Sequence, residues 1–261
     1  MFRKKAIRFC TKVKQLRVGS KSYKRFTEAH RKLNFSDRDF NGMDFSGNYL
    51  TNRSFLGAKL IGAKFRYCDL RLSGFSNADM TDAVLDNSNC KGVTFDKTNT
   101  RGLSVKGTDF TEANFYQCNL KDTDFAGATL KDTSFRATDL SGSDFSKSKP
   151  AHVQITIGSS LVNTNFEGTD CTGIDFTLTN LDRSNLKRVK FKNAWLDHAT
   201  LTNTDCSGAD FRKSSVVGTK FAGANLLGAN FTGVDVSAVY FSDKQIKEAI
   251  GISKQCQNKA A

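Results

Sequence analysis

The sequence predicts an all-β solenoid, in which a parallel β-helix is built from short repeated turns. Three observations predict it: a large apolar residue at every fifth position, a small residue two positions earlier, and turn-forming polar residues elsewhere. A period of five fits neither the 3.6-residue repeat of an α-helix nor the simple alternation of a long strand. The chain must therefore turn every few residues in one sense, so that successive coils stack.

The large apolar residues define the centres of the repeats. They run from Phe35 to Phe145 at intervals of five and resume, one residue out of step, from Leu161 to Phe241. Of the 22 Phe residues, 19 occupy such centres, so the pattern does not arise by chance. The residues expected to fill the central column include Phe110, Phe115, Leu120, Phe125, Phe166, Phe176, Phe211, Phe221 and Phe231.

The small residues two positions before the centres, such as Ala58 and Ala63, are expected to face inward as well. Neighbours two apart on an extended chain point to the same side. Five of the seven cysteines also fall on inward positions, where a thiol acts as a small hydrophobe. No cysteine pair has the CxxC spacing of a zinc or redox site, and an odd count of seven without clustering indicates a reducing, cytoplasmic compartment.

Stretches such as Gly107-Thr108-Asp109-Phe110 and Gly223-Ala224-Asn225-Leu226 resemble the consensus of the pentapeptide-repeat family. The resemblance implies a right-handed quadrilateral parallel β-helix with four repeats in each coil. The repeats then form about ten coils, and a strand spacing of about 4.8 Å gives a rod roughly 50 Å long. The five-residue period alone does not distinguish a four-sided coil from a three-sided one.

The sequence divides into repeat segments at 35–145 and 161–241, with an interruption at 146–160. The interruption contains the only proline, Pro150, and we expect an irregular loop or bulged coil there. It either absorbs a one-residue insertion or forms a binding loop, since insertions in solenoids often lie on the binding face.

Both ends of the solenoid are expected to carry caps, because an open stack exposes backbone edges and apolar side chains. We expect residues 1–34 to form a basic helical arm and an N-terminal cap. Residues 242–261 predict a C-terminal cap helix and a tail. Ser242 and Gln245 have the spacing of a capping box, and Ile246, Ala249 and Ile250 are expected to form one apolar face. A homodimer through this helix is one expected use of that face.

The basic character of the chain is concentrated at its N-terminus. The formal net charge is +13, and residues 1–34 contain twelve Lys and Arg against one acid, Glu28. The segment 35–241 contains 23 basic and 23 acidic residues, so the repeat body is neutral.

The arm has the pattern of a basic helix with an apolar stripe, which binds anionic membranes or nucleic acid. The alternatives are a second cap helix folded on the solenoid and an organellar targeting segment. Through the arm, peripheral membrane association is expected. The candidate contacts are Arg3, Lys4, Lys5, Arg8, Lys12, Lys14 and Arg17.

Catalytic signatures are absent from the sequence, so we expect no enzyme, no cofactor and no metal site. The three histidines are isolated, and no nucleophile elbow or phosphate-binding glycine loop occurs. Most acids stand directly before a centre, as Asp109 and Asp124 do, where turn chemistry explains them.

The expected function is therefore a non-enzymatic scaffold whose outward positions bind another macromolecule, most readily a protein. A candidate partner-binding patch consists of Arg183, Lys187, Arg188, Lys190, Lys192 and Arg212. The family resemblance also implies an alternative, a DNA mimic that binds DNA gyrase and protects it from quinolones. Since DNA is densely anionic and the repeat body is neutral, the charge disfavours this alternative.

Overall fold

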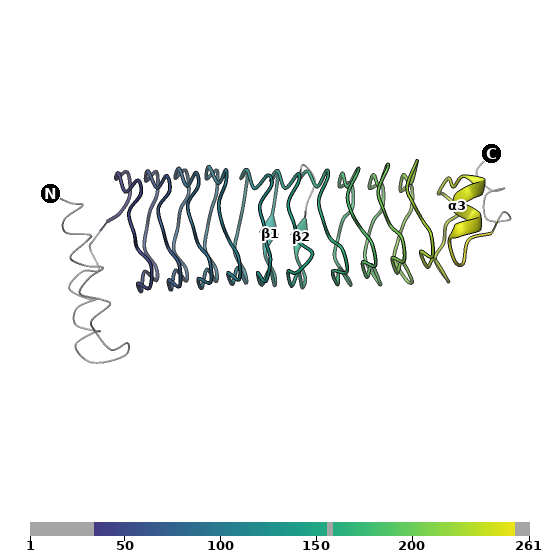
Figure 1. Cartoon of the computed structure of the whole chain (residues 1–261), viewed down its shortest axis with the longest axis horizontal. Helices are drawn as coiled ribbons and strands as arrows, with labels where there is room; N and C mark the ends of the chain where they lie inside the picture. Colours follow the sequence, from purple (N-terminus) through teal and green to yellow (C-terminus); the bar gives the residue numbers. More distant parts are fainter. Residues whose placement is uncertain (1–33, 156–158, 254–261) are drawn as a thin grey trace.

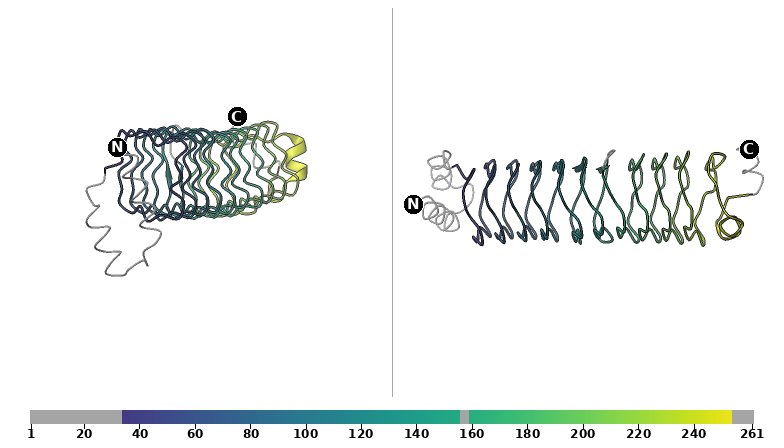
Figure 2. Two further views of the ribbon diagram at one scale, coloured as in Figure 1. Left: turned by 60° about the vertical axis from the view of Figure 1, so that its left-hand side comes forward. Right: turned by 90° about the horizontal axis from the view of Figure 1, so that it is seen from above.

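The computed structural model describes residues 34–155 and 159–253, which form a rod of stacked coils (Figure 1). Parallel bridges join residues 20 apart, as in the series Asp39, Lys59 and Asp79. One coil therefore contains four five-residue repeats, and the coil is four-sided. Figure 2 shows the same rod from two further directions. Residues 1–33, which carry the predicted basic arm, and 254–261 lie outside the described residues.

The four sides are numbered here by their centres, and residues 20 apart share a side. In the coil 179–198, sides 1 to 4 are centred on Leu181, Leu186, Phe191 and Leu196. The residue before each centre faces outward and forms the bridge to the next coil. The two residues after each centre form the turn to the next side.

Each repeat ends in a tight turn, which explains the choice of residues there. In the turn after Phe55, the N–H of Ala58 donates to the carbonyl of Phe55 at 3.0 Å, and Gly57 has φ +64°. A positive φ at the third turn residue favours Gly and Asn. Asp37 and Asn52 occupy the same position in other turns, with φ of 55° and 54°.

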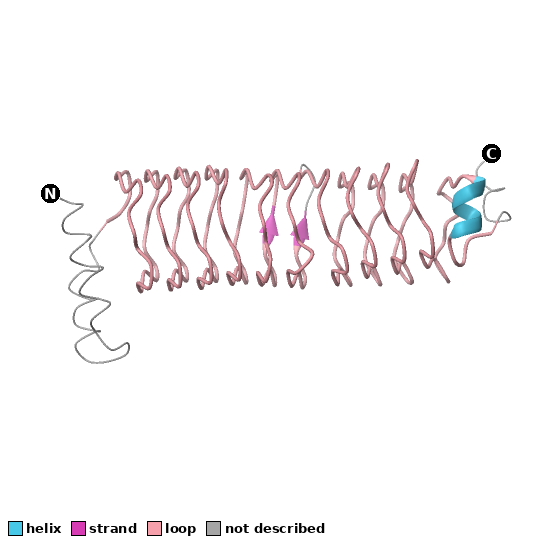
Figure 3. Cartoon of the chain, viewed as in Figure 1, coloured by secondary structure: helices cyan, strands magenta, loops and turns pink. Residues whose placement is uncertain are grey.

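Regular strands are nearly absent from the described residues because a turn interrupts the chain every five residues. The two named strands, β1 (Ser134–Phe135) and β2 (Gln154–Ile155), pair in parallel (Figure 3). Elsewhere each side contributes an isolated bridge, so the coils are held by a ladder of single pairs and by the core.

The core is a column of apolar side chains that runs along the axis of the rod. Phe rings on the same side stack between coils, for example Phe45 on Phe65 with centroids 4.8 Å apart and planes at 5°. The nine centres expected to fill the column are all at most 2% exposed. The thiols of Cys68, Cys90, Cys118, Cys171 and Cys206 are also buried in it.

Two forms were expected for 146–160, an irregular loop or a bulged coil, and the structure contradicts the irregular loop, because residues 146–155 continue the coil. Pro150 and Ile155 occupy buried centres, Lys149 pairs with Thr129, and β2 pairs with β1, all in the 20-residue register. The register becomes 21 only where Asp139 pairs with Ser160. The extra residue therefore lies between Ile155 and Ser160. A proline is tolerated at a centre because its fixed φ suits extended backbone, although it cannot donate to the next coil.

The C-terminal end is closed by α3 (Asp243–Glu248), which begins with a capping box between Ser242 and Gln245. The buried Gln245 amide donates to the carbonyls of Phe221 at 2.7 Å and Ala224 at 2.9 Å. The helix is short, as expected, but Ile250 is not part of its apolar face. Instead Ile250 pairs with Asn230 as a bridge and is 51% exposed, because Gly251 turns the chain at φ +84°. Within the described residues, no helix is long and apolar enough to cross a bilayer.

Candidate functional site

The predicted basic patch does not form one surface. Arg183 lies in the turn after side 1, Lys187 and Arg188 lie in the turn after side 2, and Lys190 lies on side 3. Lys192 and Arg212 occupy equivalent turn positions after side 3 in adjacent coils. The six residues therefore wrap around the rod, because positions close in sequence fall on successive sides.

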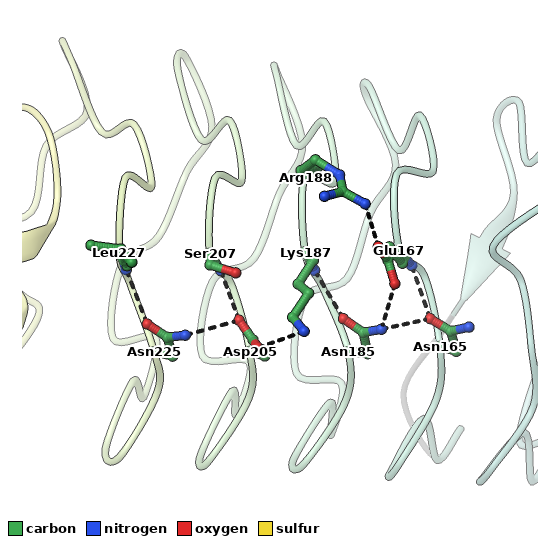
Figure 4. Close-up of polar contacts among 9 residues, drawn as sticks. All are labelled: Asn165, Glu167, Asn185, Lys187, Arg188, Asp205, Ser207, Asn225 and Leu227. Carbon is green, nitrogen blue, oxygen red and sulfur yellow. Dashed lines mark hydrogen bonds and ion pairs between the residues drawn. The ribbon is translucent and has the colours of Figure 1, made fainter.

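Four of the six basic residues are also paired with acids of the same or a neighbouring coil. Arg188 contacts Glu167, and Lys187 lies 3.3 Å from Asp205 (Figure 4). The other two pairs are Lys190 with Asp170 at 3.2 Å and Arg212 with Asp210 at 2.6 Å. The hydrogen bond from Arg212 lowers the pKa of Asp210, so this carboxylate stays charged. Exposed pairs of this kind contribute little stability, but they neutralise four of the six charges of the patch.

The Asp and Asn side chains that stand before the centres form hydrogen bonds that stabilise the fold. Figure 4 shows such a ladder on side 2, formed by Asn165, Asn185, Asp205 and Asn225. The Asn185 amide donates to Asn165 Oδ1 at 3.1 Å, and the Asn225 amide donates to Asp205 Oδ1 at 3.2 Å. Each side-chain oxygen also accepts the N–H two residues later, as Asp205 does from Ser207 at 3.1 Å. These side chains therefore form Asx turns within each coil and hydrogen-bonded ladders between adjacent coils, as turn chemistry predicts.

An exposed tryptophan on side 4 of the last coils was not part of the predicted basic patch. Trp195, the only tryptophan of the chain, stands before the centre Leu196 and is 51% exposed. It lies between Asp175 and Ser215, with which it forms parallel bridges. Leu178 and Val217, in the turns after side 4 of the preceding and following coils, are 51% and 44% exposed. The only tryptophan of the chain, at an outward position where polar residues dominate, was the available sequence signal.

A hollow of about 350 Å³ lies beside Trp195. Ser215, a small residue, stands between Trp195 and Asp235 in the row of outward positions on side 4. Val217 and Lys213 also line the hollow, from the turns on either side. The hollow therefore combines an aromatic wall, an aliphatic group and two charged groups of opposite sign.

The described residues contain no constellation suited to catalysis. No group of three or more His, Cys, Asp or Glu side chains among them could hold a metal ion. Burial raises the pKa of Cys118 and of Cys206 to about 12, so these thiols are not nucleophiles near neutral pH. His152 lies 3.5 Å from Asp132, and both side chains are exposed.

Two family models match the chain. The model described as "Pentapeptide repeat region" matches residues 108–190, and the model described as "Pentapeptide repeats (8 copies)" matches 67–102, 179–216, 191–226 and 215–243. Together the matched segments cover more than half of the chain. No curated protein sequence matches it.

Among solved structures, the chain is similar to HetL, a pentapeptide repeat protein involved in heterocyst differentiation regulation in the cyanobacterium Nostoc sp. strain PCC 7120. The identity is 22%, the coverage is 80% of this chain and 94% of HetL, and the TM-score is 0.48. Trypsin-treated QnrB1, a plasmid-mediated fluoroquinolone resistance protein, has 19% identity, 80% and 91% coverage, and a TM-score of 0.34. A pentapeptide repeat protein from the Arabidopsis thaliana thylakoid lumen has 21% identity, 57% and 83% coverage, and a TM-score of 0.19.

Proposed function

Because the chain belongs to the pentapeptide-repeat family, whose repeats leave only outward positions free for recognition, we propose that it is a non-enzymatic scaffold that binds a protein partner. Side 4 of the C-terminal coils is the proposed contact surface. The observation that carries the proposal is the exposure of Trp195 beside the hollow, with Leu178 and Val217 around it. Tryptophan is strongly enriched among residues that dominate binding energy at protein interfaces.

The surface chemistry supports a protein partner over a polyanion. Four of the six basic residues in the predicted patch are paired with acids, and the acids before the centres hold turns. A rod that replaces DNA would need a dense and uncompensated negative surface. DNA mimicry toward a topoisomerase, the second candidate, therefore has less support from this surface, although QnrB1 is a fluoroquinolone resistance protein.

Two further contacts are part of the proposal. The N-terminal arm, with seven basic residues between Arg3 and Arg17, would hold the scaffold at anionic surfaces in the cytoplasm. The C-terminal end exposes Tyr240 at 81% and Ile250 at 51%, which suits a contact between two copies. Both are separate from side 4 in sequence and can be tested separately.

The test is a quantitative affinity purification with three forms of the intact protein. Trp195→Asn introduces the residue that Asn165, Asn185 and Asn225 provide at the same position of other repeats, so the fold is retained. Leu227→Ser, the matched control, removes an apolar side chain that is 60% exposed on side 2 and copies Ser207 of the preceding coil. We expect partners to be lost from Trp195→Asn and retained by Leu227→Ser and the wild type. Equal recovery on all three forms would exclude side 4 as the binding surface.

A further inference from the structure

Side 4 around Trp195 has a charge that distinguishes it from the rest of the rod. In the repeats 174–178, 194–198, 214–218 and 234–238, side 4 contains three acids and no Lys or Arg. The acids are Asp175, Asp197 and Asp235. Lys213, in the turn that leads to side 4, is the one cation among the residues that line the hollow. The exposed indole is thus set among acids of side 4, although the repeat body as a whole is neutral.

Asp175 is the carboxylate closest to the indole in the stacking order. It bridges directly to Trp195, so the two outward side chains lie in adjacent coils about one strand spacing, roughly 4.8 Å, apart. Its Oδ1 accepts the Thr177 N–H at 2.8 Å, which fixes the orientation of the carboxylate. Unlike Asp170 and Asp210, Asp175 forms no ion pair with a Lys or Arg in the part of the chain that the structure describes.

We propose that side 4 binds an arginine of an extended segment in the protein partner, with the guanidinium stacked on Trp195 and paired with Asp175. A cation over the face of an indole is attracted by the ring quadrupole, and tryptophan is the best platform for this contact. Arginine fits better than lysine because its planar guanidinium stacks on the ring and pairs with a carboxylate at the same time. This inference rests on the proposed function and names the chemistry of the partner.

The hollow supplies a second contact next to the first. Ser215 and Val217 both line the hollow, and Val217 contributes an aliphatic group to the lining. The Asp197 carboxylate accepts the Ser215 hydroxyl at 2.5 Å and the Val217 N–H at 2.9 Å, which holds this turn in place. An apolar residue beside the arginine would fill the hollow. The expected motif in the partner is therefore an arginine followed or preceded by an aliphatic residue.

The single tryptophan makes the binding measurable without a label. The full-length protein is titrated with the acetylated tripeptide amide Leu-Arg-Leu and with the same peptide in which citrulline replaces arginine. Citrulline has nearly the same shape and no charge. The readout is the indole N–H resonance of Trp195, which is the only indole of the chain.

The arginine peptide is expected to shift the indole resonance saturably, and the citrulline peptide is expected to bind about tenfold more weakly. Asp175→Asn should reduce the affinity for the arginine peptide severalfold, since it keeps the Asx turn and removes the charge. Asp139→Asn, the matched control on side 1, should leave it unchanged. Higher salt should weaken binding of the arginine peptide and not of the citrulline peptide.

Equal binding of the two peptides, an indole resonance that does not move, or equal effects of Asp175→Asn and Asp139→Asn would each overturn the inference. If a purified partner requires Trp195 but binds Asp175→Asn as tightly as the wild type, the scaffold function stands and the arginine inference fails. A synthetic peptide of residues 1–18 is added as a final arm. Tighter binding of that peptide than of any partner segment would assign the site to the N-terminal arm of a second copy and overturn the assignment to another protein.

Discussion

Replacement of Phe125 tests the register of the whole solenoid. Phe125 is fully buried at a centre of side 2, where its ring stacks on Phe145 with centroids 4.6 Å apart and meets Phe135 edge-on at 5.9 Å. Phe125→Ala should cost about 3–5 kcal/mol in the free energy of unfolding. The loss of the ring pairs contributes about 0.5–1.5 kcal/mol each to that cost. Phe125→Asp should cost several kcal/mol more, because the column offers no partner for a charge.

Such costs compare with a total stability of about 5–15 kcal/mol for a typical domain. At about 2–4 °C per kcal/mol, Phe125→Ala should lower the melting temperature by about 6–20 °C. Phe125→Leu should recover much of this loss, since Leu120 and Leu130 occupy neighbouring centres. The control Lys121→Asp changes an exposed turn position and should cost less than about 0.5 kcal/mol.

The assay is thermal unfolding followed by circular dichroism, with amide hydrogen exchange to locate the damage. Because each coil contacts only its neighbours, lost protection in Phe125→Ala should be greatest in the coils that flank position 125 and smaller toward both ends. Equal melting temperatures for Phe125→Asp and Lys121→Asp would refute the assignment of inward and outward positions. Uniform loss of protection along the rod would refute the nearest-neighbour account.

Four other outcomes are expected. Gln245→Ala should lower the free energy of unfolding by about 1–3 kcal/mol, because the buried carbonyls of Phe221 and Ala224 lose their donor. Faster amide hydrogen exchange in the last coils, with unchanged exchange near Phe45, would show it. The five buried thiols should resist a disulfide reagent at about pH 8 in the native protein and react in guanidinium chloride, since burial raises the pKa of Cys118 and Cys206 to about 12. Hydrogen bonds from Arg212 and Thr172 lower the pKa of Asp210 and of Asp170, respectively. The stability that these two carboxylates contribute is therefore present above the unfolded pKa of about 3.9 and is lost as the pH falls through the folded values. This loss should appear as a falling melting temperature below about pH 4. Deletion of residues 1–18 should abolish binding to anionic vesicles, because each Lys or Arg contributes about 1 kcal/mol, and retained binding would show that the arm does not anchor the protein.

The core could be predicted from the sequence because burial in this fold depends on one period. A centre such as Phe166 needs only to be apolar and five residues from the next centre, and the column follows. Pro150 was missed because proline does not belong to the consensus, although a centre requires only extended backbone and an apolar side chain. Ile250 was missed because apolar spacing of three and four predicts a helix face, whereas the chain leaves α3 after Glu248 and pairs with Asn230.

The site could not be predicted from proximity in sequence, for a geometric reason. Lys187 and Lys192 are five residues apart and lie on different sides, whereas Asp175 and Trp195 are 20 apart and are neighbours. A cluster in the sequence therefore becomes a ring around the coil, and a surface on the rod is a row of residues at 20-residue intervals. Sorting outward residues by side, rather than by position, would have separated the paired basic residues from the acidic surface around Trp195.

Trp195 also departs from what the fold itself favours at its position. In most repeats the residue before the centre is Asp, Asn, Ser or Thr, and the Asp and Asn oxygens accept an N–H from the following turn, as Asp175 does from Thr177. Tryptophan cannot accept that bond, and the N–H of Asp197 has no hydrogen-bond partner among the described residues. The indole remains 51% exposed, so about half of its surface still faces solvent. An exposed aromatic side chain at a position where most repeats place a turn-forming residue supports the proposed contact with a partner outside the coil.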